Sequence, residues 1–417
     1  MNNKINYNKI EKELRLSALL QDSYDFETIN LIAPACIIPS KYYENISLKH
    51  YNIAEGLLEK RMYAGLKYFN QIESSVAKLA RHIFNAEHAN VQPHSVSQAN
   101  QAVYQALLNN QDKVLAMKFT AGGHLTHGMK KNFSGRFFDF SFYGLDKDGF
   151  IDYKELEEKA LKEKPKLIVC GASSYPRKID FKKLHNISKK VGAYLMADLS
   201  HPAGLIAVNK FPQPFPYCDV VTLTLDKTML GTHGGIILCK KYLKDAIDSA
   251  VHPGVQSSIP LRRIYEMGLC LIDATKPRFK NYIERMIANM KMLEKKFKKY
   301  SGLMVTGGTD SNLIVLDTYS VFGLTGEQSE FLLENLGLFT NRQVIPGEKF
   351  KPSIASGIRL GTAWITGRGY SRDEVGIIAD IILDNLKDSK NIILQEKSKK
   401  IVKNLISKKR KNDVWNK

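Results

Sequence analysis

The residue best placed to do chemistry in this chain is a lysine at the end of an expected strand. Residues 219–225 form a short, apolar, β-branched run, which predicts a buried strand that delivers Asp226 and Lys227 to its carboxyl end. Open α/β sheets bind their ligands at that edge. A lysine there could hold a carbonyl compound as a Schiff base, whereas a lone lysine at a strand end is more often an ordinary solvated residue.

Two further strand-like runs bring polar groups to the same edge of the expected sheet. Residues 193–197 are followed by Asp198 and, three positions later, by His201, and residues 166–170 run into a turn that is rich in hydroxyl groups. An amine, a carboxylate and an imidazole at neighbouring strand ends are the groups that pyridoxal phosphate needs. The amine binds its aldehyde, and the carboxylate keeps its pyridine nitrogen protonated.

A predicted helix start upstream supplies an expected anion site. Ser95 and Ser97 open a run in which apolar residues recur at helical spacing. Serine hydroxyls and free backbone amides at a helix start bind anions, here the cofactor phosphate, although the same serines would also suit a simple helix cap.

Four longer motifs resemble those of the serine hydroxymethyltransferase family. They are residues 86–95 (AEHANVQPHS), 122–128 (GGHLTHG), 132–135 (NFSG) and 356–362 (SGIRLGT). The resemblance extends from about residue 30 to about residue 385, with the motifs in the family's order. It implies a fold-type-I pyridoxal phosphate enzyme, an α/β protein with a large domain on a mostly parallel sheet and a smaller C-terminal α+β domain.

The resemblance also implies a role for each matching residue. Lys227 would bind the cofactor aldehyde, and Asp198 would pair with the pyridine nitrogen. Arg359 would bind the substrate carboxylate, and Glu55, with Tyr63 close by, would be the acid–base group. The remaining cofactor contacts would be His201 near the phenolic oxygen, His124 stacked on the ring, Ser95, Ser97 and Gln98 at the phosphate, and Ser173 at the ring substituents.

Several positions depart from the family pattern. The histidine before the lysine is Asp226, the arginine of Gly-Pro-Arg-Gly-Gly is His233, and the glycine between the phosphate serines is Val96. The other replacements are Pro34-Ala35-Cys36 for Ser-Glu-Asn, Ile53 for Tyr, Met62 for Tyr, Gln256-Ser257-Ser258 for Gln-Gly-Gly, Gln343 for Asn, and Ala363-Trp364 for Pro-Ala. The residues for chemistry at the substrate Cα thus match the family better than the residues of the pterin site do. Tetrahydrofolate stays a possible second cofactor, although the lost polar groups argue against its binding.

Two classes of function follow. The first is a pyridoxal phosphate enzyme that makes or breaks the Cα–Cβ bond of a small β-hydroxy amino acid. It is either a hydroxymethyltransferase that exchanges serine and glycine or a folate-independent aldolase that joins a glycine-derived carbanion to another aldehyde. The second is a non-catalytic protein that keeps the fold as a binding or regulatory module. We expect the enzyme, with the transferase ahead of the aldolase, working as a homodimer.

The composition suits a large globular protein. With 417 residues, 44% of them hydrophobic, the chain can bury two cores. We expect an N-terminal arm (1–50), a large domain (51–270), a small domain (271–386) and a basic tail (387–417), and the family resemblance implies that the arm packs on a partner subunit. The five cysteines lack metal-ligand spacing, and no apolar run approaches the ~18 residues of a membrane span, so no metal and a cytoplasmic location are expected.

The net charge of +19 is concentrated at the C-terminus. Residues 387–417 hold eleven Lys or Arg against three acids. Such a run could contact nucleic acid or anionic lipid. No nucleic-acid motif accompanies it, so we expect a solvated terminal extension, part of it a short amphipathic helix.

Overall fold

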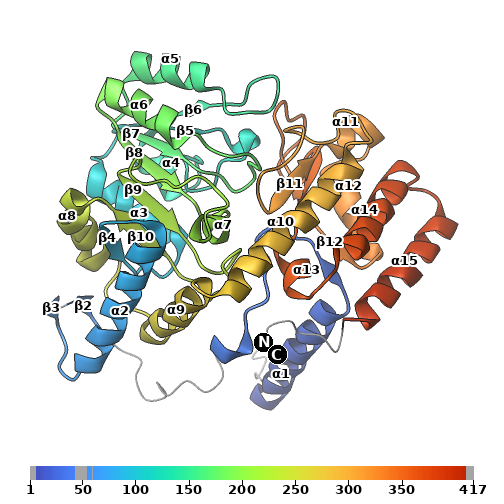
Figure 1. Ribbon diagram of the computed structural model, residues 1–417, viewed down its shortest axis with the longest axis horizontal. Helices are drawn as coiled ribbons and strands as arrows, with labels where there is room; N and C mark the ends of the chain where they lie inside the picture. Colours follow the sequence, from blue (N-terminus) through green and yellow to red (C-terminus); the bar gives the residue numbers. More distant parts are fainter. Residues whose placement is uncertain (1–5, 43–53, 59, 410–417) are drawn as a thin grey trace, which may run out of the picture.

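The computed structural model describes residues 6–42, 54–58 and 60–409. A seven-stranded sheet in the order β4-β10-β9-β8-β7-β5-β6 forms its centre (Figure 1). Strands β5 to β9 run parallel, and β10 is antiparallel to both of its neighbours, which confirms the predicted α/β class. The strands are β4 (His88–Asn90), β5 (Lys113–Met117), β6 (Asp139–Tyr143), β7 (Leu167–Cys170), β8 (Tyr194–Asp198), β9 (Val220–Leu223) and β10 (Ile236–Cys239).

Both faces of this sheet are buried, which explains why its central strands read as continuous apolar runs. Successive side chains point to opposite faces, so each strand contributes to two cores. The two sets include Leu115, Ile168 and Leu195 on one face, and Val114, Val169 and Met196 on the other. The first face is covered by α2 (Lys67–Phe84), α5 (Tyr153–Glu163), α6 (Phe181–Val191) and α9 (Leu261–Ala274), the second by α3 (Val96–Leu107) and α8 (Lys244–Ser249).

A smaller α+β part follows, joined to the sheet by one long helix. The helix α10 (Pro277–Phe297) contributes Phe279 to the first core (Figure 1). It contributes Leu293 and Phe297 to a separate core, here called the small-domain core. That core covers a three-stranded antiparallel sheet, β11-β14-β13. Its elements are β11 (Leu313–Leu316), α11 (Thr318–Phe322), α12 (Gly326–Asn335), β13 (Asn341–Gln343), β14 (Gly357–Gly361), α13 (Ala363–Gly367) and α14 (Arg372–Lys387). We retain the division near residue 270 as a proposal.

The N-terminal segment has two different environments. The helix α1 (Tyr7–Phe26) has no buried residue and exposes Leu14, Leu19 and other apolar side chains. By contrast, β1 (Ile29–Asn30) pairs with β12 (Leu338–Phe339), and Ile29 is buried in the small-domain core. Only α1 therefore retains the character of an arm within the described part of residues 1–50. Ile53 lies outside the described residues.

We expected the basic C-terminal segment to be a solvated extension. Over most of its length, it is not. It forms the helix α15 (Ile392–Ser407), whose residues Val402, Leu405 and Ile406 are buried in the small-domain core. Lys409 then pairs with Glu374 of α14 at 2.7 Å. The expectation was wrong because the apolar positions of this helix outweigh its charge. Within the described residues, no helix is long and apolar enough to span a membrane.

Removing one of these buried side chains should destabilise the protein. Leu405 is 4% exposed, so Leu405→Ala should lower the free energy of unfolding by about 2–4 kcal/mol through lost burial and a cavity. Urea unfolding followed by circular dichroism would measure it. The matched control is Ile393→Ala, at a position that is 85% exposed in the same helix. Equal stability of the two variants would contradict the packed position of α15.

Candidate active site

A cavity of about 160 Å³ lies at the carboxyl ends of β7, β8 and β9. The start of α3 forms another part of its wall. Lys227, which follows β9, lines this cavity together with the residue that ends β8, Asp198. The full lining is Ser95, Val96, Ser97, His124, Ala172, Ser173, Asp198, Ser200, His201, Thr224, Asp226, Lys227 and His233.

Asp198 is a buried carboxylate held by several donors. Its Oδ1 accepts from Ser200 Oγ at 2.6 Å, and its Oδ2 accepts from Asn100 Nδ2 at 2.9 Å and His127 Nε2 at 3.3 Å. Burial by itself would raise the pKa of Asp198, but the hydrogen bonds and neighbouring imidazoles hold that pKa well below its ordinary value. The carboxylate is therefore ionised and presents a fixed negative charge to the cavity.

Two histidines of this cavity, His124 and His201, are neutral. Burial lowers the pKa of His124 to about 4, against the opposing effect of the Asp198 charge, and lowers the pKa of His201 well below its ordinary value. His124 Nδ1 lies 2.8 Å from Thr126 Oγ1. His201 Nδ1 has no hydrogen-bond partner among the described residues, although the side chain is buried. The possible ligand atoms of His124, His127 and Asp198 lie within 4.8 Å of one another, so this group could hold a metal ion. The expected absence of a metal therefore stays a prediction.

Lys227 and Arg359 bring two cations to this region from elements of different sheets. Burial lowers the pKa of the Lys227 amine, although the charges of Asp198 and Asp226 oppose the effect. The neutral amine that attacks an aldehyde is thus easier to form. Arg359, on β14, donates to the Ser173 backbone oxygen at 2.7 Å. Burial lowers its pKa to about 10, so it remains charged at neutral pH.

The helix start at Ser95 has the geometry of an anion site. Ser95 is the N-cap of α3, and its Oγ accepts from the Gln98 backbone N–H. The first-turn amides of a helix have no partner within the helix and point out of its end, here beside Val96 and Ser97 in the cavity wall. Gln98 differs from the expectation, because its side chain bonds to the backbone of His94 and Val255 and is not among the described lining residues.

Glu55 and Tyr63 are brought to each other, but not to Lys227. Tyr63 donates to Glu55 Oε2 at 2.8 Å, and His252 Nε2 lies 3.5 Å from Glu55 Oε1. The hydrogen bond to Glu55 raises the pKa of the Tyr63 hydroxyl. Neither residue is among the described residues that line the Lys227 cavity.

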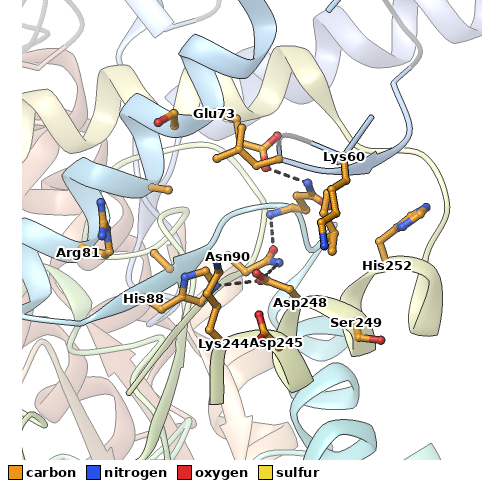
Figure 2. Close-up of a pocket in the computed structure, with 16 residues that line it drawn as sticks. Lys60, Glu73, Arg81, His88, Asn90, Lys244, Asp245, Asp248, Ser249 and His252 are labelled. Carbon is orange, nitrogen blue, oxygen red and sulfur yellow. Dashed lines mark hydrogen bonds and ion pairs between the residues drawn. The ribbon is translucent and has the colours of Figure 1, made fainter. Parts of the chain in front are cut away.

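A larger cavity, of about 560 Å³, is lined by residues that follow Glu55 in the chain, among them Lys60, and by His252 (Figure 2). Several of its polar groups are paired. Glu73 of α2 binds Arg61 and also accepts from Gln92 Nε2, while Asp248 accepts from Asn90 and pairs with His88. Because Arg61 also donates to the Gly56 backbone oxygen, this network fixes the hairpin of β2 (Gly56–Leu57) and β3 (Lys60–Arg61), which carries Glu55.

Sequence reasoning missed the buried network behind Asp198. Thr222 donates to Asn100 Oδ1 at 2.6 Å, and Asn100 Nδ2 donates to both Asp198 and Thr126 Oγ1. The signal was an asparagine on the apolar face of α3, one turn after the expected phosphate serines. A polar residue at such a position needs buried partners.

The family model for serine hydroxymethyltransferase matches residues 17–382 of this chain. The chain belongs to the serine hydroxymethyltransferase family. The serine hydroxymethyltransferase of Mycoplasma capricolum is 43% identical over 404 residues, which cover 96% of this chain and 97% of that protein. Those of Mesoplasma florum and Mycoplasma mycoides are 45% and 42% identical, covering 84% and 93% of this chain, and 85% and 96% of their own lengths.

Membership confirms the predicted family, fold type and enzyme class. The chain is a serine hydroxymethyltransferase-like, pyridoxal phosphate-dependent enzyme for a small amino acid, in a family that uses tetrahydrofolate as its one-carbon carrier. The cavity fits this cofactor. It offers an amine with a lowered pKa, an ionised carboxylate, a helix start for the phosphate and an unpartnered buried imidazole nitrogen, in Lys227, Asp198, Ser95–Ser97 and His201.

The neutral state of His124 gives an expected pH dependence. Its pKa is about 4 in the folded protein and 6.5 ordinarily, so between these values the unfolded chain binds more protons. The free energy of unfolding must then fall as pH falls through this window. Between pH 7 and pH 5 the wild-type apoprotein should lose on the order of 2 kcal/mol more than His124→Gln, measured by urea unfolding.

The control for this comparison is His82→Gln, which changes an exposed imidazole on α2. It should follow the wild type. A His124→Gln variant with the same pH dependence as wild type would contradict a neutral, buried His124.

Proposed function

We propose that Lys227, Asp198 and Arg359 are the centre of a hydroxymethyltransferase site that cleaves and forms the Cα–Cβ bond of serine. One observation carries this proposal: Lys227 and Asp198 line the same small cavity, the amine with a lowered pKa and the carboxylate held ionised. When bound, pyridoxal phosphate supplies the electron sink that accepts the pair of electrons from the breaking bond.

The chain's own groups would divide the remaining work. Asp198 would hold a proton on the pyridine nitrogen, because its charge is fixed by donors behind it. His201 and His124 would contact the cofactor oxygen and ring, Ser95 and Ser97 its phosphate, and Ser173 its substituents. Arg359 would bind the substrate carboxylate through its planar guanidinium.

Glu55 and Tyr63 would serve the site of a second subunit. Both lie outside the described lining of their own Lys227 cavity, and Tyr63 is 44% exposed. Glu55 would there take the proton of the β-hydroxyl group as the bond breaks. We therefore infer a homodimer, which the exposed apolar side chains of α1 support. We also propose a cytoplasmic location, in keeping with five free cysteines.

The cofactor assignment predicts a specific covalent product. Borohydride reduction of the purified protein should leave a pyridoxyl group on Lys227, identified by mass spectrometry of its peptide. Lys227→Ala should carry none. Asp198→Asn should still bind the cofactor but should slow turnover on the order of a hundredfold, because a neutral amide no longer stabilises the pyridinium. A reducible linkage that persists in Lys227→Ala would contradict the assignment.

A second candidate, folate-independent aldol cleavage, is favoured by one group of contacts. Gln343, which stands at an expected pterin position, accepts from Ser174 Oγ at 2.7 Å, and Ser174 also contacts Arg359. Trp364, at another, is buried in the small-domain core. Side chains engaged in this way are not free to bind a pterin, and each buried polar group left unpaired costs about 1–3 kcal/mol.

The two candidates differ in their response to tetrahydrofolate. The folate-independent candidate predicts that a β-hydroxy amino acid such as threonine is cleaved without folate, with little effect of tetrahydrofolate on glycine deprotonation. Glu55→Gln should reduce cleavage on the order of a hundredfold, as removal of an acid–base group does. Glu158→Gln, an exposed glutamate of α5, is the matched control. Strong enhancement at micromolar tetrahydrofolate would instead favour serine–glycine exchange.

A further inference from the structure

Two of the replaced residues in the cavity bind each other. Asp226 stands where the family has a histidine, and His233 stands where it has an arginine. The Asp226 carboxylate accepts from Thr224 Oγ1 at 2.6 Å through Oδ1 and from His233 Nδ1 through Oδ2. The two replacements therefore form one unit, in which a new carboxylate fixes the orientation of a new imidazole.

This pair lines the same cavity as the start of α3. Ser95, Val96 and Ser97 contribute to its wall, as do Asp226 and His233. The cavity holds only about 160 Å³, less than the roughly 300–1,000 Å³ usual for a ligand site, so a ligand bound there lies close to all of its walls. An anion on the α3 amides would therefore experience the charge of the Asp226–His233 pair.

The effect of this pair on a bound phosphate depends on the charges of Asp226 and His233. A phosphate monoester carries up to about two negative charges, and the helix start offers roughly half a positive charge. Asp226 alone would add another negative charge to the cavity and oppose the phosphate. His233 reverses this effect when both ring nitrogens are protonated, because Nδ1–H then donates to Asp226 and Nε2–H is left to donate to a second anion.

The bond to Asp226 leaves the other ring nitrogen of His233, Nε2, unused by the carboxylate. The side chain of His233 is 62% exposed, whereas that of Asp226 is 22% exposed. The Cys36 thiol also donates to the Asp226 backbone oxygen at 3.2 Å, which fixes the main chain that carries the pair. Asp226 is thus placed to position His233.

We propose that His233, oriented by Asp226, is a ligand of the cofactor phosphate and offsets the repulsion of that carboxylate. This inference rests on the proposed function, which places the phosphate at Ser95–Ser97. It has a specific consequence. Loss of His233 alone leaves the Asp226 charge uncompensated, so it should weaken phosphate binding more than loss of both residues does.

The test compares two probes that differ only in the phosphate, pyridoxal phosphate and pyridoxal. Each is titrated into the cofactor-stripped full-length protein, and its dissociation constant is measured by absorbance. His233→Ala should weaken pyridoxal phosphate binding about tenfold or more, the loss expected for a charge-assisted hydrogen bond. Binding of pyridoxal should change by less than about twofold. In the double variant Asp226→Ala/His233→Ala, part of the lost pyridoxal phosphate affinity should return.

The controls separate a phosphate contact of His233 from a role elsewhere in the cavity. His82→Ala, at an exposed imidazole of α2, should leave both dissociation constants unchanged. Equal weakening of both probes in His233→Ala would point to a role at the lysine or in proton transfer and would overturn the phosphate role. An unchanged pyridoxal phosphate affinity, or a double variant weaker than His233→Ala, would overturn it too.

The outcomes also distinguish this inference from the proposed function. A wild-type protein whose Lys227 carries the reducible linkage, with unaltered phosphate affinity in His233→Ala, keeps the proposed function and loses only the inference. A wild-type protein that binds no pyridoxal phosphate loses both.

Discussion

The chemistry of this protein depends on one buried charge, the ionised carboxylate of Asp198 at the end of β8. Burial opposes that charge, and a carboxylate without partners would take up a proton instead. It stays ionised because Ser200, Asn100 and His127 donate to it. Asn100 is in turn fixed by Thr222 of the neighbouring strand, so the charge is set by the packing of α3 against the sheet.

A second constraint is that the site combines residues from two hydrophobic cores. Lys227 and Asp198 follow strands of the large sheet, whereas Arg359 is carried by β14 of the small one. The helix α10 packs into both cores and thereby sets the distance between them. Arg359 also donates to the Ser173 backbone, so the guanidinium itself links β14 to the turn that follows β7. A change in the small-domain core would reach the chemistry along this path.

The sequence predicted those parts of the site that follow from local pattern. Short apolar runs identified β7, β8 and β9, and strand ends in a parallel sheet meet at one edge, so Lys227, Asp198 and Ser173 could be grouped from their positions in the chain alone. Gln98 was expected at the phosphate, but whether its amide faces the cavity or the backbone of Val255 depends on a contact 157 residues away. The final helix was misjudged because charge dominates its composition, although four apolar residues at helical spacing decide its packing.

The replaced positions also follow a physical rule. The Asp198 network is shared by four or more groups, and changing any one leaves a buried polar atom unpaired, at a cost of about 1–3 kcal/mol. The side chains of His233 and Asp226 lie nearer the solvent and are hydrogen-bonded to each other. A pair of this kind can change together, because each new residue satisfies the other. Asp226 and His233 thus depart from the family pattern together, whereas Asp198, which depends on many donors, matches it.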